Sequence, residues 1–218
     1  MAKITNAFDT YGAQADREEL SDIIYNISPM QTPFLSSVGK SNVSNVVFDW
    51  QTEQLPTPSS SGKLEGFELS RSASTATVRE SNVCMISSRD ATVTGSQEAS
   101  DAAGKNSEMA HQLALMSKAL KRDMEEALVG NIAKVSGSAS AARQTRSLET
   151  WYQSNVNKAS DGANGSASAA RTNGTRRDLT EAMVKDVQQQ CFTNGAEPSI
   201  LMCGPYNKSV ISGFTGRS

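Results

Sequence analysis

The stretch QEASDAAGKNSEMAHQLALMSKALKRDMEEALV, residues 97–129, decides the fold because it carries the strongest periodic pattern in the chain. Its apolar side chains recur every three or four residues, the spacing of one helix face, at Met109, Leu113, Met116, Leu120 and Met124. Gly104 lowers the helix propensity of the first part of this stretch. Ser107 is a favourable N-cap residue, and Gly130 is a favourable residue just after the end of a helix. We predict one long helix over these residues, secure from Ser107, with its Met and Leu stripe in the core.

The residues before this helix predict a long hairpin excursion. Loosely alternating apolar residues at 43–55 and again at 75–94 indicate two strands. The stretch 51–81 turns polar, with Pro56, Pro58 and a serine triplet at 59–61. Because a two-stranded hairpin is only marginally stable in water, we expect this one to need support from elsewhere.

Residues 1–40 have the pattern of an arm. Helical spacing of apolar residues is present over 16–25, and Pro29 and Pro33 stop it because the residue before a proline is pushed towards extended geometry. Phe34 and Leu35 follow as apolar anchors. A segment with anchors and two prolines is suited to lie across another surface.

The residues after the long helix form a polar region and then a second helix. Residues 131–177 are rich in Ser, Ala, Gly and Asn, and the heptapeptide GSASAAR occurs at 137–143 and again at 165–171. The repeat indicates two matching loop or edge segments, with chance in a biased composition as the alternative. A helix is predicted over 178–193, capped by Asp178 and Glu181 and ended by Asn194 and Gly195. Residues 200–203 then suggest a short buried strand.

The hydrophobic content is low for a domain that folds without a partner. Hydrophobic residues make up 37% of the 218, and the net charge is −2. The Ser- and Gly-rich stretches bury too little apolar surface to offset the entropy of ordering, so they are either disordered or ordered by a partner. The absence of a basic run argues against specific nucleic-acid binding. No apolar stretch reaches the roughly 18 residues of a membrane span, and three scattered cysteines favour thiols in a reducing cytosol.

No catalytic, cofactor or metal constellation is visible. His111 is the single histidine and lies beside the apolar stripe, without the nucleophile and orienting acid that a catalytic base needs. The segment around Gly39 and Lys40 ends like a phosphate-binding loop, but Phe34 stands where that loop requires glycine. The cysteines have no metal-ligand spacing. The sequence therefore predicts a protein that is not an enzyme and has no cofactor.

The motifs, in their order, resemble those of a known family. The most specific is REELSDIIYNISP at 17–29, followed by TPF at 32–34; supporting motifs are TGSQE at 94–98, SEMA at 107–110, LKRDME at 120–125, TRSL at 145–148 and SGFTG at 212–216. With these, nearly the whole chain resembles the major capsid proteins of tailed bacteriophages with the Hong Kong 97-like fold. More closely, it is similar to a phage family long catalogued as of unknown function.

The resemblance implies an α+β fold in four parts. Residues 1–42 would be an N-terminal arm, 43–96 an extended β-hairpin loop, 97–177 the peripheral domain with its spine helix, and 178–218 the start of an axial domain. It also implies contacts with neighbouring subunits through Arg17, Leu20, Ile23, Ile24, Tyr25, Pro29, Pro33, Phe34, Trp50, Leu64 and Phe67.

The function implied is self-assembly into the icosahedral head shell that encloses viral DNA. The partners would be pentamers and hexamers of the same chain, with scaffold, portal or decoration proteins, and packaged DNA touched only non-specifically. The protein would be made in the host cytoplasm and reside in the virion. A virion accessory protein, a decoration or scaffold protein that binds the shell, is the alternative. Relatives continue beyond the 212–216 motif, so we expect either a truncated sequence or a short shell protein completed by other chains.

Overall fold

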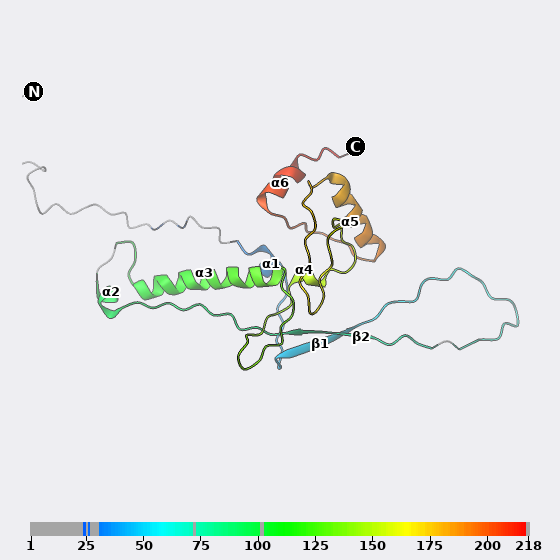
Figure 1. Ribbon diagram of the computed structural model, residues 1–218, viewed down its shortest axis with the longest axis horizontal. Coiled ribbons are helices and arrows are strands. Elements are labelled where there is room, and N and C mark those ends of the chain that lie inside the picture. Colours follow the sequence, from blue (N-terminus) through cyan, green and yellow to red (C-terminus); the bar gives the residue numbers. More distant parts are fainter. Residues whose placement is uncertain (1–23, 25, 27–30, 72, 101–102, 217–218) are drawn as a thin grey trace, which may run out of the picture. The chain divides into compact units, whose positions relative to one another are not determined.

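The computed structural model describes residues 24, 26, 31–71, 73–100 and 103–216. These residues combine helices with one β-ribbon, which makes the fold a mixed α+β fold (Figure 1). They group into two units, divided at the 31/32, 87/88 and 122/123 boundaries. The helix predicted over 178–193 and the hairpin lie in the second unit, and the long helix runs from the first unit into the second.

The first unit contains a helix break that the sequence pattern did not predict. Helix α2 covers Gly95–Ala99 and helix α3 covers Glu108–Val129, so the expectation of one helix from residue 97 is wrong. Gly104 adopts a left-handed backbone (φ +79°) between them, a conformation open to glycine and incompatible with a continuing helix. The start at Ser107 is confirmed, because its Oγ accepts a hydrogen bond from Ala110 N at 3.1 Å, as an N-cap does.

The apolar stripe of α3 is not a core in this chain. None of the described α3 side chains is buried, and Leu113 is 61% exposed. The prediction of a core position is therefore wrong. An amphipathic pattern identifies the face of a helix that avoids water, but it does not say which chain covers that face.

The second unit is organised around a two-stranded antiparallel ribbon. Strand β1 (Val47–Thr52) pairs with strand β2 (Val78–Val83), in a register that runs from Val47 opposite Val83 to Thr52 opposite Val78. The predicted hairpin is confirmed, with shorter strands than the alternation suggested. Beyond the paired residues the chain continues as an extended loop, of which residues 53–71 and 73–77 are described (Figure 1).

Four helices complete the second unit: α1 (Pro33–Ser37), α4 (Leu148–Trp151), α5 (Glu181–Thr193) and α6 (Pro205–Ser212). The predicted cap of α5 is wrong, because Thr180 rather than Asp178 accepts the capping hydrogen bond from Met183 N. Its end is as predicted, with Gly195 in the left-handed region. The predicted strand over 200–203 is also wrong.

The 200–203 segment is exposed and irregular, and it leads into α6. Gly204 is the N-cap of α6 and Pro205 is its first residue, the position where proline's missing N–H costs nothing. A short apolar run does not distinguish a buried strand from an exposed linker. Proline at the first turn of a helix is the local signal in the sequence for α6.

Candidate assembly surfaces

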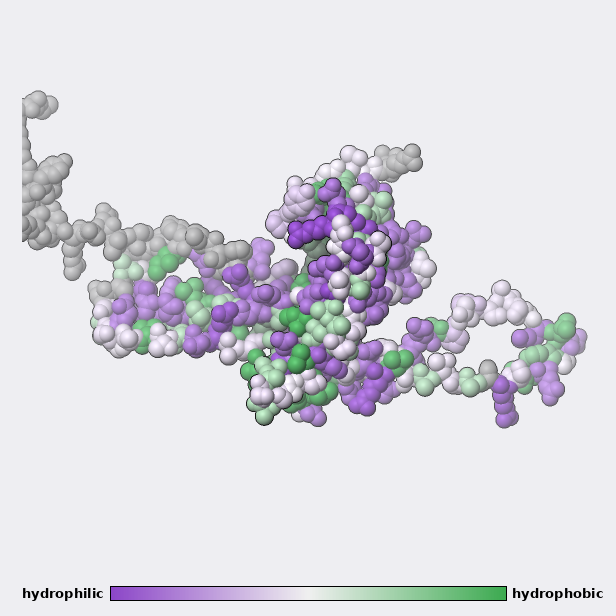
Figure 2. Space-filling view, viewed as in Figure 1, coloured by the Kyte–Doolittle hydropathy of each residue, from purple (hydrophilic) through white to green (hydrophobic). Residues whose placement is uncertain are grey.

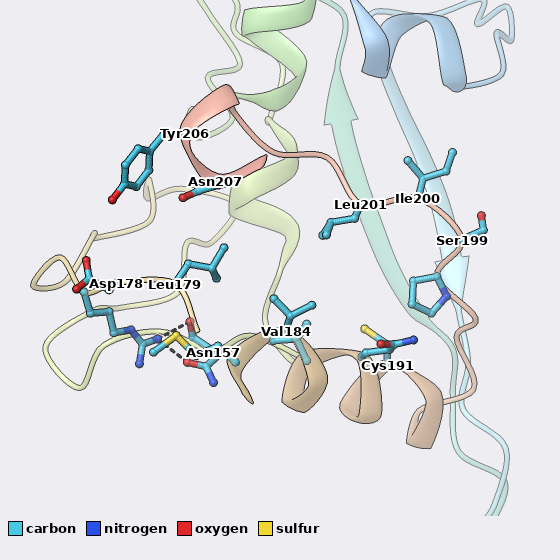
Figure 3. Close-up of a pocket in the computed structure, with 15 residues that line it drawn as sticks. Asn157, Asp178, Leu179, Val184, Cys191, Ser199, Ile200, Leu201, Tyr206 and Asn207 are labelled. Carbon is cyan, nitrogen blue, oxygen red and sulfur yellow. Dashed lines mark hydrogen bonds between the residues drawn. The ribbon is translucent and has the colours of Figure 1, made fainter. Parts of the chain in front are cut away.

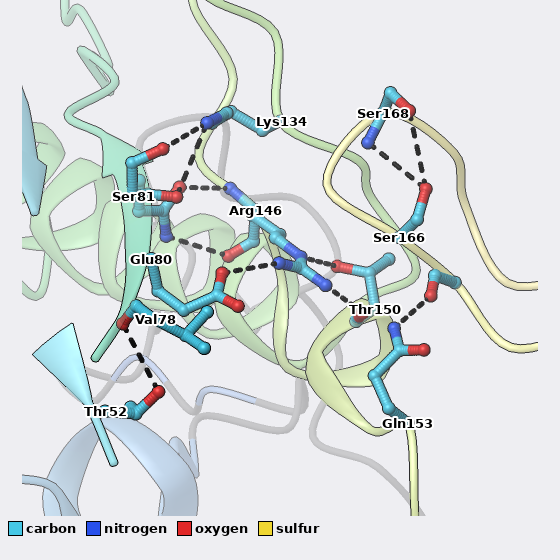
Figure 4. Close-up of polar contacts among 12 residues, drawn as sticks. Thr52, Val78, Glu80, Ser81, Lys134, Arg146, Thr150, Gln153, Ser166 and Ser168 are labelled. Carbon is cyan, nitrogen blue, oxygen red and sulfur yellow. Dashed lines mark hydrogen bonds and ion pairs between the residues drawn. The ribbon is translucent and has the colours of Figure 1, made fainter. Parts of the chain in front are cut away.

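The best-formed site in the second unit is a buried polar cluster at the root of the ribbon. Among the described residues the only hydrophobic side chain that is buried is Val83, whereas the side chains of Asn82, Arg146, Ser147 and Thr150 are buried and polar. Buried polar groups are tolerated when they are hydrogen-bonded. Figure 4 shows Arg146 and Thr150 pointing towards each other, with Ser81 and Glu80 of β2 beside Arg146.

Arg146 is the centre of this cluster. Its Nε donates to Thr150 Oγ1 at 3.2 Å, and one Nη donates to the Thr150 carbonyl at 2.5 Å. The guanidinium carbon lies 3.7 Å from the centroid of the Trp151 ring, a cation–π arrangement. Burial disfavours the charged form and lowers the pKa of Arg146, and the Glu80 carboxylate, 3.9 Å away, opposes that shift.

Asn82 ties the second strand to the same segment. Its side-chain oxygen accepts from Arg146 N at 2.9 Å, and its amide nitrogen donates to the Arg146 carbonyl at 3.3 Å. Thr145 Oγ1 donates to the Val83 carbonyl at 2.8 Å, and Lys134 Nζ donates to Ser81 Oγ. Directional hydrogen bonds thus connect the root of the second strand to the 131–150 segment.

Aromatic rings extend the cluster onto the first strand. The Trp50 and Trp151 ring centroids are 5.1 Å apart, and Phe48 stacks on Trp50 at 5.9 Å. Both separations are in the range that stabilises aromatic pairs. Trp50 therefore packs on its own chain, and its side chain is still partly exposed. It is one of the residues that the resemblance implicates in subunit contacts.

The extended loop presents apolar side chains to solvent. Leu55 is 93% exposed and Leu64 is 87% exposed, with Phe67 and Leu69 also exposed. Figure 2 shows apolar residues at the far end of the loop. Phe67 N donates to the Leu64 carbonyl at 3.0 Å, and Gly66 supplies the left-handed residue (φ +80°) of this turn. Leu64 and Phe67 were selected from the sequence; Leu55 and Leu69 were not, although both are apolar residues in a polar stretch.

Helix α1 is held by one carboxylate. Glu125 accepts hydrogen bonds from Phe34 N at 2.8 Å and from Leu35 N at 2.7 Å. Pro33 occupies the start of α1 and is exposed, while the Phe34 side chain is half-buried. Of the other residues chosen from the sequence, Ile24 is exposed, and Arg17, Leu20, Ile23, Tyr25 and Pro29 lie outside the described residues.

A groove of about 600 Å³ runs along α5. One wall is the stripe predicted from the sequence, which includes Leu179, Met183 and Val187, and the other wall is formed by Ile200 and Leu201 (Figure 3). The sequence does not reveal the second wall, because a short apolar run such as 200–203 also fits a buried strand. The groove is apolar and open, the character of a binding surface.

Neither a cluster of metal-ligating side chains nor a membrane-spanning helix is found among the described residues. No group of three or more His, Cys, Asp or Glu side chains in the described part of the chain could hold a metal ion. Among the helices that the structure describes, none is both long and apolar enough to cross a membrane. The three cysteines are free thiols, and His111 lies half-buried on α3.

The geometry is that of an interaction protein, and comparison with known proteins specifies which kind. Residues 3–218 match the SU10 major capsid protein family. The chain is also similar to the major capsid protein of Escherichia phage Phieco32, with 24% identity in an alignment 242 residues long, which includes 95% of this chain and 69% of the relative. The protein is therefore a structural component of a phage capsid shell and resides in the virion as part of a multimeric assembly. The chain belongs to the SU10 major capsid protein family.

Proposed function

We propose that this chain forms the icosahedral head shell of a tailed bacteriophage, as pentamers and hexamers with the Hong Kong 97-like fold. One observation supports this most directly: the described chain buries a single hydrophobic side chain, Val83, while apolar residues of the ribbon, α3 and the extended loop are exposed. Exposed apolar surface on this scale marks a binding surface. Copies of the same chain are the partners that a shell supplies.

We propose that four segments of the chain have different structural roles in the shell. Residues 1–42 form an arm, 43–96 an extended hairpin loop, 97–177 a peripheral domain with its spine helix, and 178–218 the start of an axial domain. The ribbon and the extended loop support the second assignment, because several of their apolar residues, among them Val47, Val78 and Leu64, are exposed. The 22-residue α3 supports the third.

The proposed subunit contacts are the residues selected from the sequence. In the arm they are Arg17, Leu20, Ile23, Ile24, Tyr25, Pro29, Pro33 and Phe34, and in the ribbon and extended loop they are Trp50, Leu64 and Phe67. Leu55 joins this set on its exposure. Scaffold, portal and decoration proteins are the further partners proposed, with synthesis in the host cytoplasm and no catalytic role. With a net charge of −2 the chain has little overall electrostatic attraction for DNA, so the contact proposed with packaged DNA is weak and non-specific.

Sedimentation of the purified chain tests the proposal. We expect large particles, or rings of five or six subunits, and a strictly monomeric profile at high concentration in several salts would contradict it. The sharper test is a double variant, Leu64→Asp with Phe67→Asp, which replaces two exposed apolar side chains by charges. We expect it to lower the assembled fraction several-fold while leaving the far-UV circular dichroism of the subunit unchanged.

The matched control is Ser60→Asp with Ser70→Asp. Both serines are exposed residues of the extended loop, so this variant adds the same charge without removing apolar surface. It should assemble nearly as well as the wild type. Equal losses in the two variants would indicate that charge alone prevents assembly, and the apolar contact would then be rejected.

A further inference from the structure

The repeated heptapeptide forms the same turn twice. In the first turn (residues 137–143) Ser138 N donates to the Ala141 carbonyl at 2.9 Å, and in the second turn (165–171) Ser166 N donates to the Ala169 carbonyl at 2.8 Å. An antiparallel bridge closes each turn at the same offsets, Val135 with Gln144 and Ala163 with Thr172. The serine hydroxyls repeat as well, each accepting from a backbone N–H three residues on at 3.1 Å. The repeat is therefore structural, and the interpretation as two matching loop segments is confirmed.

The second turn is covered by its own chain. Asn131 accepts from Arg171 N and donates to the Arg171 carbonyl, both at 2.6 Å, while Lys134 N donates to the Ala167 carbonyl at 3.1 Å. Gln153 donates to the Gly165 carbonyl. Gly165 is buried so closely against Thr150 that an added Cβ would lie 2.8 Å from the Thr150 Cα.

The first turn presents the corresponding groups without cover. Within the described part of the chain, no hydrogen bond reaches the Gly137 or Ala139 carbonyl or the Arg143 backbone, which are the equivalents of the groups covered in the second turn. Gly137 and Arg143 instead line an open groove of about 400 Å³ together with Ile86, whose side chain is 80% exposed. The aliphatic part of the Arg143 side chain packs against Gly137. In the second turn the equivalent glycine, Gly165, is in contact with Thr150 instead.

We infer that the first turn is a contact surface for a second copy of this chain, which covers it as residues 131–153 cover the second turn. The second turn shows what this heptapeptide binds: a backbone segment and an amide side chain that satisfy its carbonyls and its arginine N–H.

This inference depends on assembly of the chain into a shell, but not on the four-segment map. Amide hydrogen exchange tests it, because both arginine amides follow an alanine in an identical heptapeptide and so have the same intrinsic rate. In the unassembled subunit we expect the Arg171 amide to be protected and the Arg143 amide to exchange fast. In assembled particles the Arg143 amide should slow by at least about tenfold. Particles in which its rate equals that of the subunit would overturn the inference while leaving the shell function intact.

A charge reversal provides the second measurement. Arg143→Glu should lower the assembled fraction several-fold, because Arg143 lines the groove of the proposed contact and the change reverses the charge there. Arg171→Glu is the matched control, since it makes the same change in the same heptapeptide at a backbone that is already covered. Unchanged circular dichroism of the subunits would show that both variants fold. Equal assembly of the two variants would overturn the inference.

Discussion

At the scale of single residues, Arg146 shows how this chain builds an interior with little apolar material. A buried cation is costly unless its donors are matched. Here the guanidinium meets two oxygens of Thr150 and the face of Trp151, and its backbone meets Asn82. Arginine suits this position because its planar group can donate in several directions and stack on a ring at the same time.

We predict that Arg146→Met destabilises the subunit by about 2–3 kcal/mol, the usual effect of losing hydrogen bonds to a charged group in a buried site. Methionine keeps much of the stem volume but leaves the Thr150 oxygens without donors. Urea unfolding followed by tryptophan fluorescence measures the change, and Trp151 and Trp50 report it from inside the cluster.

Arg79→Met is the comparison for that experiment. Arg79 lies on β2, the strand that carries Asn82, and pairs with Asp49 across the ribbon, but its side chain is 74% exposed. Exposed ion pairs contribute little to stability, so the urea midpoint should hardly move. Equal shifts in the two variants would mean that the cluster around Arg146 is no more important than a surface pair.

At the scale of elements, the junction between α2 and α3 shows a second use of a carboxylate. Glu98 of α2 accepts from Ser107 Oγ at 2.7 Å and from Met109 N at 2.9 Å, so it satisfies the first turn of α3 together with Ser107. The hydrogen bond from Ser107, with the one from Met109, lowers the pKa of Glu98 below its ordinary value of 4.5. A negative charge at the start of a helix is also favoured by the helix dipole.

Acidification should therefore fray α3 from its first turn. Because the folded-state pKa of Glu98 lies below 4.5, its stabilisation is complete above that pH and is lost as the pH falls through the folded value. Glu98→Gln should reduce helicity at neutral pH and flatten its dependence on pH below 4.5. Part of the dependence should remain, because the ion pair with Lys105 lowers the pKa of Glu108 as well.

Far-UV circular dichroism of the unassembled subunit against pH is the measurement. Glu126→Gln, an exposed carboxylate near the other end of α3, serves as the control and should keep the wild-type profile. An unchanged profile for Glu98→Gln would show that the hydrogen bonds of Glu98 do not hold the helix start.

Local signals made the elements predictable, and contacts distant in sequence made the rest unpredictable. Ser107 and Gly195 were identifiable because caps are encoded within one turn. The hairpin was identifiable from alternation on both sides of a polar stretch. The hydrogen bond from Phe34 N to Glu125 joins residues about ninety positions apart, and no periodic pattern in the sequence indicates it. The cover on the second turn is equally invisible, because both heptapeptides are identical in sequence and differ only in what lies against them.

At the scale of the whole molecule, a subunit with almost no apolar interior should gain stability from its neighbours. Val83 is the only hydrophobic side chain buried in the described chain. In an assembly, binding of the folded subunit to other copies shifts the unfolding equilibrium by mass action. Stability should then be a property of the shell more than of the single chain.

We therefore predict that the melting temperature rises with protein concentration through the range in which particles form. An apolar dye such as anilinonaphthalene sulfonate should bind the unassembled subunit and be released on assembly, because neighbouring copies cover the residues that bind it. Calorimetry and dye fluorescence over a dilution series provide the two measurements. A melting temperature and dye binding that are both independent of concentration would show that the exposed surface stays exposed in the particle.

The polar root of the ribbon also has a mechanical consequence. Apolar side chains can slip past one another with little loss of energy, but hydrogen bonds to Asn82, Ser81 and Val83 hold one register and must break together if the ribbon shifts. The root of the ribbon is therefore fixed against sliding along the 131–150 segment. If neighbouring subunits pull on the extended loop, as the proposed contact at Leu64 requires, the load reaches the 131–150 segment through these hydrogen bonds. The ribbon should then detach first at its root.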